Sequence, residues 1–80
     1  MASKEIMSPL PGTFFRRPSP GKPPYKEEGD RVAAGDVVGL VEVMKTFYEV
    51  KADTAGLIVK FLVENEAPIQ AGEAIVALDV

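Results

Sequence analysis

Apolar residues follow a β-strand pattern over most of the chain beyond residue 32. A run rich in Val and Leu covers residues 37–43, and the next stretch, residues 46–52, alternates between apolar and polar positions. Two further runs rich in β-forming residues lie at 57–63 and 75–80. Short strands at this spacing, with glycine turns between them and no helical periodicity of useful length, are typical of an all-β sandwich or barrel.

The apolar positions within and near these runs supply the expected core. A small domain must bury one face of each short strand, so these side chains are expected to point inward. The candidates are Val38, Leu40, Val50, Val59, Phe61, Ile69, Ile75 and Leu78.

The chain contains an internal repeat. Residues 32–38 and 69–75 share an apolar residue, a small residue, glycine, an acid and further apolar residues, at an offset of 37. A second correspondence sets residues 8–14 on residues 52–58, at an offset of 44. Because the glycine, the acid and the apolar positions agree together, a real two-fold repetition is favoured over a chance alignment of β-rich sequence.

An insertion interrupts the first half of this repeat. The two offsets differ by seven, so seven extra residues lie between Gly12 and Gly35, where residues 18–24 contain four of the seven prolines. Proline lacks an amide hydrogen and has a fixed φ, so this stretch can be neither helix nor central strand. We expect an extended loop outside the sheets. Arg16 and Arg17 at its base either bind a phosphate or a partner or, as their place in a loop favours, are solvated charges.

The chain must reverse somewhere between residues 37 and 52. As one strand this stretch would span roughly 50 Å at ~3.3 Å per residue, too long for a small domain. In the repeat, Val80 at the end of the second half corresponds to Val43, which places the reversal just after Val43. We predict a two-residue hairpin turn at Met44 and Lys45. Such turns need positive φ and favour Gly, Asn and Asp, so Met-Lys breaks a local rule, as is expected at a functional site.

Composition excludes several classes of function. The absence of histidine and cysteine excludes zinc sites built on those residues, cysteine nucleophiles, Ser-His-Asp triads and disulfide scaffolds. Nine basic and 12 acidic residues give a net charge of -3, which disfavours nucleic acid or an anionic membrane as partner. No apolar run reaches the ~20 residues of a membrane span, and residues 1–7 lack the apolar centre of a secretory signal. We expect no catalytic residue, no metal site and a cytoplasmic location.

The tip of the predicted hairpin resembles a cofactor-attachment site. Taken alone, Lys45 is typical of an ordinary surface lysine. Met44-Lys45, preceded by Glu42, resembles the Ala-Met-Lys-Met site at which biotin is joined to carrier domains. Residues 8–16 and the following Pro-Ser-Pro at 18–20 resemble the biotin carboxyl carrier subunits of bacterial acetyl-CoA carboxylase. That family has a thumb inserted in its first half, where the seven extra residues fall.

This resemblance implies an all-β fold, a flattened two-sheet barrel-sandwich hybrid with a pseudo-two-fold repeat and a Pro-rich thumb insertion. It implies an N-terminal extension at residues 1–7, a biotinyl carrier domain at residues 8–80 and a thumb loop at about residues 18–25. The site departs from the family at Val43, where alanine is usual, and at Thr46, where methionine is usual. Neither departure removes the lysine.

The implied function is that of a carrier and not of an enzyme. A biotin protein ligase would join biotin to Lys45, a biotin carboxylase would load a carboxyl group, and a carboxyltransferase would pass it to acetyl-CoA. Met44 would belong to the motif that the ligase recognises. Phe47 is either a recognition contact or a partly covered strand residue. Glu42 either shapes the charge that the ligase meets or is an exposed strand residue.

A lipoyl-type swinging-arm carrier is a rival interpretation, since it shares the two-fold sandwich and the tip lysine. Lipoyl sites usually have Asp before the lysine and lack a thumb, so Met44 and the insertion argue against lipoate. The sequence is also compatible with a biotinyl carrier of another acyl-CoA or keto-acid carboxylase, and with an unmodified interaction module. It favours neither a monomer nor a self-associated form.

Overall fold

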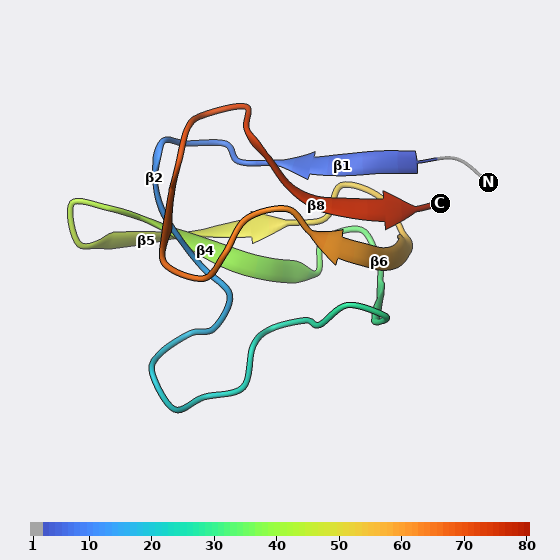
Figure 1. Ribbon diagram of the computed structural model, residues 1–80, viewed down its shortest axis with the longest axis horizontal. Helices are drawn as coiled ribbons and strands as arrows, with labels where there is room; N and C mark the ends of the chain where they lie inside the picture. The colour runs from blue at the N-terminus through green and yellow to red at the C-terminus, as the bar shows by residue number, and fades with distance from the viewer. Residues whose placement is uncertain (1–2) are drawn as a thin grey trace.

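Two four-stranded antiparallel sheets make up the structure, a computed structural model that describes residues 3–80 (Figure 1). The strands are β1 (Ser3–Met7), β2 (Gly12–Phe15), β3 (Arg31–Val32), β4 (Val37–Val43), β5 (Thr46–Lys51), β6 (Gly56–Phe61), β7 (Ala67–Ile69) and β8 (Ala74–Asp79). One sheet has the order β1-β8-β6-β3 and the other β5-β4-β2-β7. The all-β prediction is confirmed, and β4, β5, β6 and β8 match the four predicted strands closely. Residues 3–80 contain no helix long and apolar enough to cross a membrane.

The predicted two-fold repeat is confirmed by the topology. A shift of 44 residues carries β1 onto β5 and β2 onto β6, and a shift of 37 carries β3 onto β7 and β4 onto β8. The two sheet orders then correspond position by position. The joints between the halves are equivalent as well: the Gly35 amide donates to the Ala52 carbonyl, and the Gly72 amide donates to the Ser8 carbonyl, each at 2.8 Å.

The glycine-acid pair of the repeat has a structural explanation. The Asp36 carboxylate accepts a hydrogen bond from the Ala33 amide at 2.9 Å, and the Glu73 carboxylate accepts one from the Gln70 amide at 2.8 Å. The glycine before each acid has a positive φ, 94° and 82°, which a side chain would strain. Each acid therefore closes a tight turn that leads into the long strand of its half, β4 or β8.

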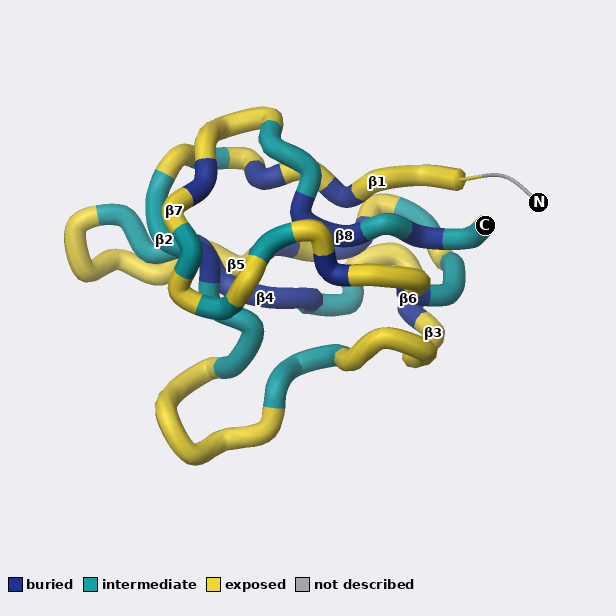
Figure 2. Tube along the Cα trace, viewed as in Figure 1, coloured by how far each residue is buried: buried dark blue, intermediate teal, exposed yellow. Residues whose placement is uncertain are grey.

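The hydrophobic core lies between the two sheets (Figure 2). All predicted core residues except Val59 are buried, although Leu40 lies outside the main cluster. The main cluster consists of Ile6, Phe14, Val32, Val38, Val41, Val50, Ala52, Ile58, Phe61, Ile69, Ile75, Val76 and Leu78.

The prediction of Val59 as a core residue is wrong, because its side chain is 56% exposed. Strand β6 contains a β-bulge at this position. Ile58 pairs with Leu78 and Lys60 pairs with Ala77, so Val59 has no partner in β8. The extra residue interrupts the alternation of inward and outward side chains, which sequence periodicity assumes to be continuous.

Residues 3–7, which belong to the expected N-terminal extension, form a strand of the sandwich. These residues form β1, which pairs with β8 from Ser3 opposite Asp79 to Met7 opposite Ala74, and Ile6 is buried in the core. The repeat contained the signal, since the offset of 44 continued backward would have set Ile6 on Val50. Strand β1 completes its sheet because β8 would otherwise present an unpaired edge.

The bulge in β6 leads to a test of the register. Ile58→Ala should lower the free energy of unfolding by about 2–5 kcal/mol, because it leaves a cavity in the core. Val59→Ala should change it by no more than about 0.5 kcal/mol, because the side chain is largely in water. Urea denaturation of both variants measures the difference. A larger loss for Val59→Ala than for Ile58→Ala would mean that the strand alternates without a bulge, with Val59 and Phe61 on the same inner face.

Candidate functional site

The hairpin between β4 and β5 carries the predicted site at its tip. Met44 and Lys45 form the two-residue turn, with φ values of 51° and 67°. Positive φ at both central residues is the pattern of a type I′ turn, whose twist matches that of the strands. The predicted turn is therefore confirmed in position and in backbone geometry. The left-handed region costs a residue with a side chain roughly 1–2 kcal/mol, so this turn is strained relative to one built from Asn and Gly.

The side chains of the turn point into solvent. Met44 is 93% exposed, and Lys45 is exposed as well. Within residues 3–80, no hydrogen bond or ion pair involves the side chain of either residue. The tip lies at the far left of Figure 1, at the end of the molecule opposite the two chain termini. A primary amine in this position is accessible to a large enzyme from several directions.

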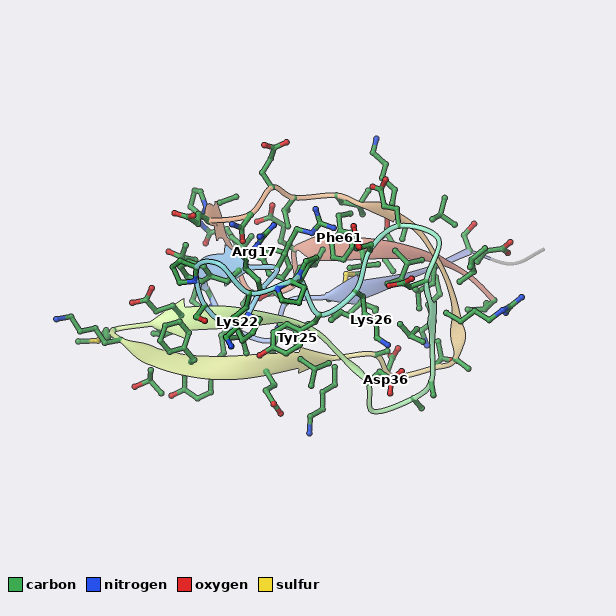
Figure 3. The ribbon with its side chains drawn as sticks, turned by 90° about the horizontal axis from the view of Figure 1, so that it is seen from below. Arg17, Lys22, Tyr25, Lys26, Asp36 and Phe61 are labelled. Carbon is green, nitrogen blue, oxygen red and sulfur yellow. The ribbon has the colours of Figure 1, made fainter. Side chains whose placement is uncertain are left out.

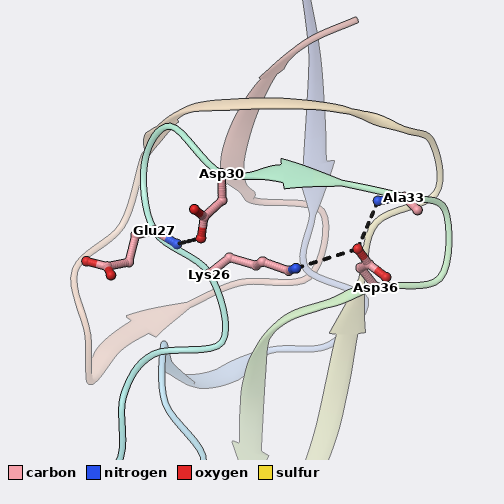
Figure 4. Close-up of polar contacts among 5 residues, drawn as sticks. All are labelled: Lys26, Glu27, Asp30, Ala33 and Asp36. Atoms are coloured by element: carbon pink, nitrogen blue, oxygen red, sulfur yellow. Dashed lines mark hydrogen bonds and ion pairs between the residues drawn. The ribbon is translucent and has the colours of Figure 1, made fainter.

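Several other lysines are less free. Lys4, Lys26 and Lys51 each have their ammonium nitrogen 3.4–3.6 Å from a carboxylate oxygen. Figure 4 shows the pair between Lys26 and Asp36. These pairs are partly or largely solvent-exposed and contribute little to stability. They do occupy the ammonium groups, whereas the ammonium of Lys45 has no such pair among the described residues.

The two further predicted residues, Glu42 and Phe47, face each other across the hairpin. They form a cross-strand pair two residues from the turn on either side. Phe47 is 54% exposed, and its ring packs edge-to-face against Phe15 with ring centroids 6.0 Å apart. Glu42 is partly buried and also lies opposite Thr13 of β2. Phe47 thus has one covered side and one open side, so packing and recognition are both compatible with its position.

The proline-rich insertion protrudes between β2 and β3, at the bottom of Figure 1. We call residues 18–25 the thumb loop. Its neck is closed by the Tyr25 amide, which donates to the Arg16 carbonyl at 2.9 Å. Inside the loop, the Lys22 amide donates to the Ser19 carbonyl at 3.2 Å, and Arg17 Nη1 donates to the Lys22 carbonyl at 3.3 Å. Figure 3 shows Arg17, Lys22 and Tyr25 along this segment.

A pocket of about 360 Å³ lies between the thumb loop and the hairpin, and we call it the thumb pocket. Its lining comes from three parts of the chain: Phe15 with Arg17–Pro20, Phe47, and Asn65 with Glu66. Sequence reasoning missed the pocket. Asn65 and Glu66 lie in a turn that carries no motif, and only the fold brings this turn beside the thumb.

Arg16 and Arg17 are partly buried and make specific contacts, so the expectation of solvated charges holds only in part. The guanidinium carbon of Arg16 lies 4.2 Å from the centroid of the Phe61 ring, which is a cation–π contact. Arg17 lines the thumb pocket, and the Nε atoms of both residues are buried. Phe61 lies 45 positions from Arg16 in the sequence, so local patterning could not indicate this contact.

The chain is similar to biotin carriers over most of its length. A family model described as "Biotin-requiring enzyme" matches residues 4–78. The biotin carboxyl carrier protein of acetyl-CoA carboxylase from Nostoc sp. is 36% identical over 74 residues, which is 92% of this chain and 41% of that protein. Its counterpart from Chlamydia muridarum is 46% identical over 67 residues, 84% of this chain and 41% of that protein. The chain thus spans about two fifths of the length of these relatives.

Solved structures agree with the fold. The urea carboxylase of Kluyveromyces lactis matches with a TM-score of 0.81 and 29% identity, over 99% of this chain and 6% of that one. A single-chain, multi-domain long-chain acyl-CoA carboxylase matches with a TM-score of 0.76 and 21% identity, over 94% of this chain and 7% of that one. In both cases a small part of a large chain has the same two-sheet architecture.

The strain in the hairpin turn predicts a stability change. Met44→Asn should raise the free energy of unfolding by about 0.5–1 kcal/mol, because Asn tolerates positive φ and almost no buried surface is lost. Met44→Val should lower it, because a β-branched residue is disfavoured at positive φ. Thermal and urea unfolding of both variants gives the comparison. The same stability for Asn and Val at this position would contradict a left-handed turn.

Proposed function

The chain belongs to the family of biotin-requiring enzyme domains, and from this we propose that Lys45 carries biotin through an amide on its side-chain nitrogen. The observation that carries the proposal is the exposed lysine on a two-residue left-handed turn. A modifying enzyme needs an unpaired amine that can enter its active site, and the hairpin presents one. Met44 beside it is the residue we propose as part of the motif that a biotin ligase recognises.

The residues around the tip fit a covalently attached arm. The four-carbon stem of lysine is long and flexible, and its ammonium group makes no ion pair within the described chain. The attached biotin supplies a ureido nitrogen that can take up and give back a carboxyl group. The body of the domain holds the base of the arm still, because β4 and β5 are tied into a sheet that packs on the core. A tethered group visits two active sites at high effective concentration without dissociating between them.

We propose that this domain is a carrier without catalytic residues of its own. Its partners would be a biotin ligase, a biotin carboxylase and a carboxyltransferase, and its assembly an acetyl-CoA carboxylase. The names of the relatives from Nostoc sp. and Chlamydia muridarum support this assembly. We place it in the cytoplasm, as expected for a small acidic chain without cysteine.

A biotin carrier domain of another biotin-dependent carboxylase is the second candidate. The likeness to the urea carboxylase at 29% identity favours this candidate, because it shows a domain of this fold within a carboxylase other than acetyl-CoA carboxylase. Lipoate is disfavoured by Met44, which stands where lipoyl sites usually have Asp.

We also propose that the thumb loop positions the arm, since its pocket opens beside Phe47, two residues from Lys45.

The attachment site can be tested by labelling with a biotin ligase, ATP and biotin. Peptide mapping should place the whole label on Lys45, and Lys45→Arg should abolish labelling, because Arg keeps the charge but lacks the primary amine. Lys22→Arg and Lys60→Arg should be labelled like the unchanged chain. Since Lys45 is exposed, Lys45→Arg should leave the melting temperature nearly unchanged. Label that survives Lys45→Arg would refute the assignment.

The role of the thumb loop can be tested by deleting residues 18–24, which joins Arg17 to Tyr25. The second half of the repeat has no such loop, so the shortened chain should fold and still accept biotin. Carboxyl transfer with the partner enzymes should slow, or the arm should become more mobile. A shortened chain that unfolds would make the loop structural. Normal turnover with an arm of unchanged mobility would make it an inert insertion.

A further inference from the structure

The thumb pocket exists only while the thumb loop keeps its place. Residues 17–20 form one wall, Phe47 of the hairpin forms another, and Asn65 with Glu66 forms a third. If the loop moved outward, the first wall would be lost and the pocket would become open surface. The position of the loop therefore decides whether the Lys45 side chain, or an arm attached to it, has a formed pocket beside it.

The loop has few contacts that could hold it by themselves. Its two internal hydrogen bonds, at 3.2 and 3.3 Å, are long and lie on exposed residues. The prolines restrict the shape of the loop, but they do not attach it to the sheets. Exposed segments with few buried contacts open at little cost in free energy. The position of the loop must therefore be set at its two ends.

The C-terminal end of the loop is attached through the backbone of β6. The Gly29 amide donates to the Ile58 carbonyl, and the Ile58 amide donates to the Asp30 carbonyl, each at 2.8 Å. The Glu28 carboxylate accepts a third hydrogen bond from the Phe61 amide at 3.0 Å. This end is thus held independently of any residue on the other side of the loop.

The N-terminal end follows directly on β2, and Arg16, the first residue after this strand, contacts both the turn at Asn65 and β6. Its amide donates to the Asn65 side-chain oxygen at 2.8 Å, and its carbonyl accepts from the Tyr25 amide at 2.9 Å. Its guanidinium lies over the Phe61 ring at 4.2 Å, and its buried Nε has no hydrogen-bond partner among residues 3–80. The side chain is therefore held by stacking on the ring, which is stronger in a desolvated setting than in water.

We propose that Arg16 is a positioning residue that latches the thumb loop to β6 and so keeps the thumb pocket formed beside Lys45. Through Asn65 it joins two walls of the pocket, because this side chain binds the Arg16 amide and also lines the pocket. Through Tyr25 it closes the neck of the loop. The consequence for the arm rests on the proposed attachment of biotin to Lys45, whereas the latch itself is a property of the unmodified chain.

The experiment uses NMR relaxation on the biotinylated chain, with ¹⁵N in the backbone and in the lysine side chains. The amide formed at Lys45 Nζ then reports the mobility of the arm. Arg16→Gln removes the cation and keeps both backbone hydrogen bonds. Lys22→Gln is the matched control, since it makes the same change in charge within the loop. The hydrogen bonds of Lys22 in the loop involve only its backbone, so this variant keeps them.

In the unchanged chain, backbone order parameters of residues 18–24 should be near the rigid value of about 0.85, and Arg16→Gln should lower them below about 0.6. The order parameter at Lys45 Nζ should fall in the same variant, while Lys22→Gln leaves both at their original values. Arg16→Lys, which keeps the cation, should restore part of the order. If Arg16→Gln does not fold, Arg16→Met keeps the apolar contact with Phe61 and should loosen the loop in the same way.

Two results would overturn the latch. The first is a loop whose order parameters are unchanged in Arg16→Gln, even if the variant is less stable, since that would make Arg16 a residue of the core packing only. The second is a loop that loosens while the Lys45 arm keeps its mobility, which would remove the positioning role. If the unchanged chain accepts no biotin, the proposed function fails and the claim about the arm fails with it. Relaxation of the unmodified loop would still decide whether Arg16 holds it.

Discussion

Burial of a shared core between two small sheets is the constraint on which the structure depends. Neither four-stranded sheet could bury its apolar face alone, so each is stable only against the other. The repeat meets this need symmetrically, because most buried residues occur in pairs related by the two offsets. These pairs are Ile6 and Val50, Ser8 and Ala52, Phe14 and Ile58, Val32 and Ile69, Val38 and Ile75, and Val41 and Leu78. The long strands β4 and β8 even have equivalent bulges, at Val38 and Ile75.

The same symmetry explains why one hairpin is suited to carry a cofactor. The link from β4 to β5 corresponds to the place where β8 and β1 lie side by side at the chain ends. The two places are at opposite ends of the molecule (Figure 1). At the site end the strands are joined by the tight turn at Met44 and Lys45, whose left-handed backbone leaves the lysine fixed at its base and free at its tip. Strain of roughly 1–2 kcal/mol per turn residue is small beside the core that holds the two strands.

The thumb loop is where the two halves differ, and it adds what the symmetric fold lacks. The sandwich by itself offers a lysine on a turn, with no shaped surface beside it. The insertion supplies a wall of proline and arginine side chains, and the fold places the turn at Asn65 opposite that wall. Arg16 connects the insertion to both the core, through Phe61, and the turn, through Asn65. The insertion, which has no counterpart in the second half, is thus tied to the repeat by Arg16 at its N-terminal end and by hydrogen bonds to β6 at its C-terminal end.

The sequence by itself was sufficient for the long strands, because strand alternation depends on neighbouring residues. It was also sufficient for the two-fold repeat, and the offset of that repeat located the turn at Met44 and Lys45 although these residues are unfavourable in such a turn. The tertiary structure decided where that pattern is interrupted. Val59 leaves the core because the register between β6 and β8 requires a bulge, and register is a relation between strands that are distant in sequence. Ile6 enters the core for the same kind of reason, since β1 pairs with the opposite end of the chain. Arg16 stacks on a buried ring and binds a side chain 49 residues away, so its environment exists only once the sheets have assembled.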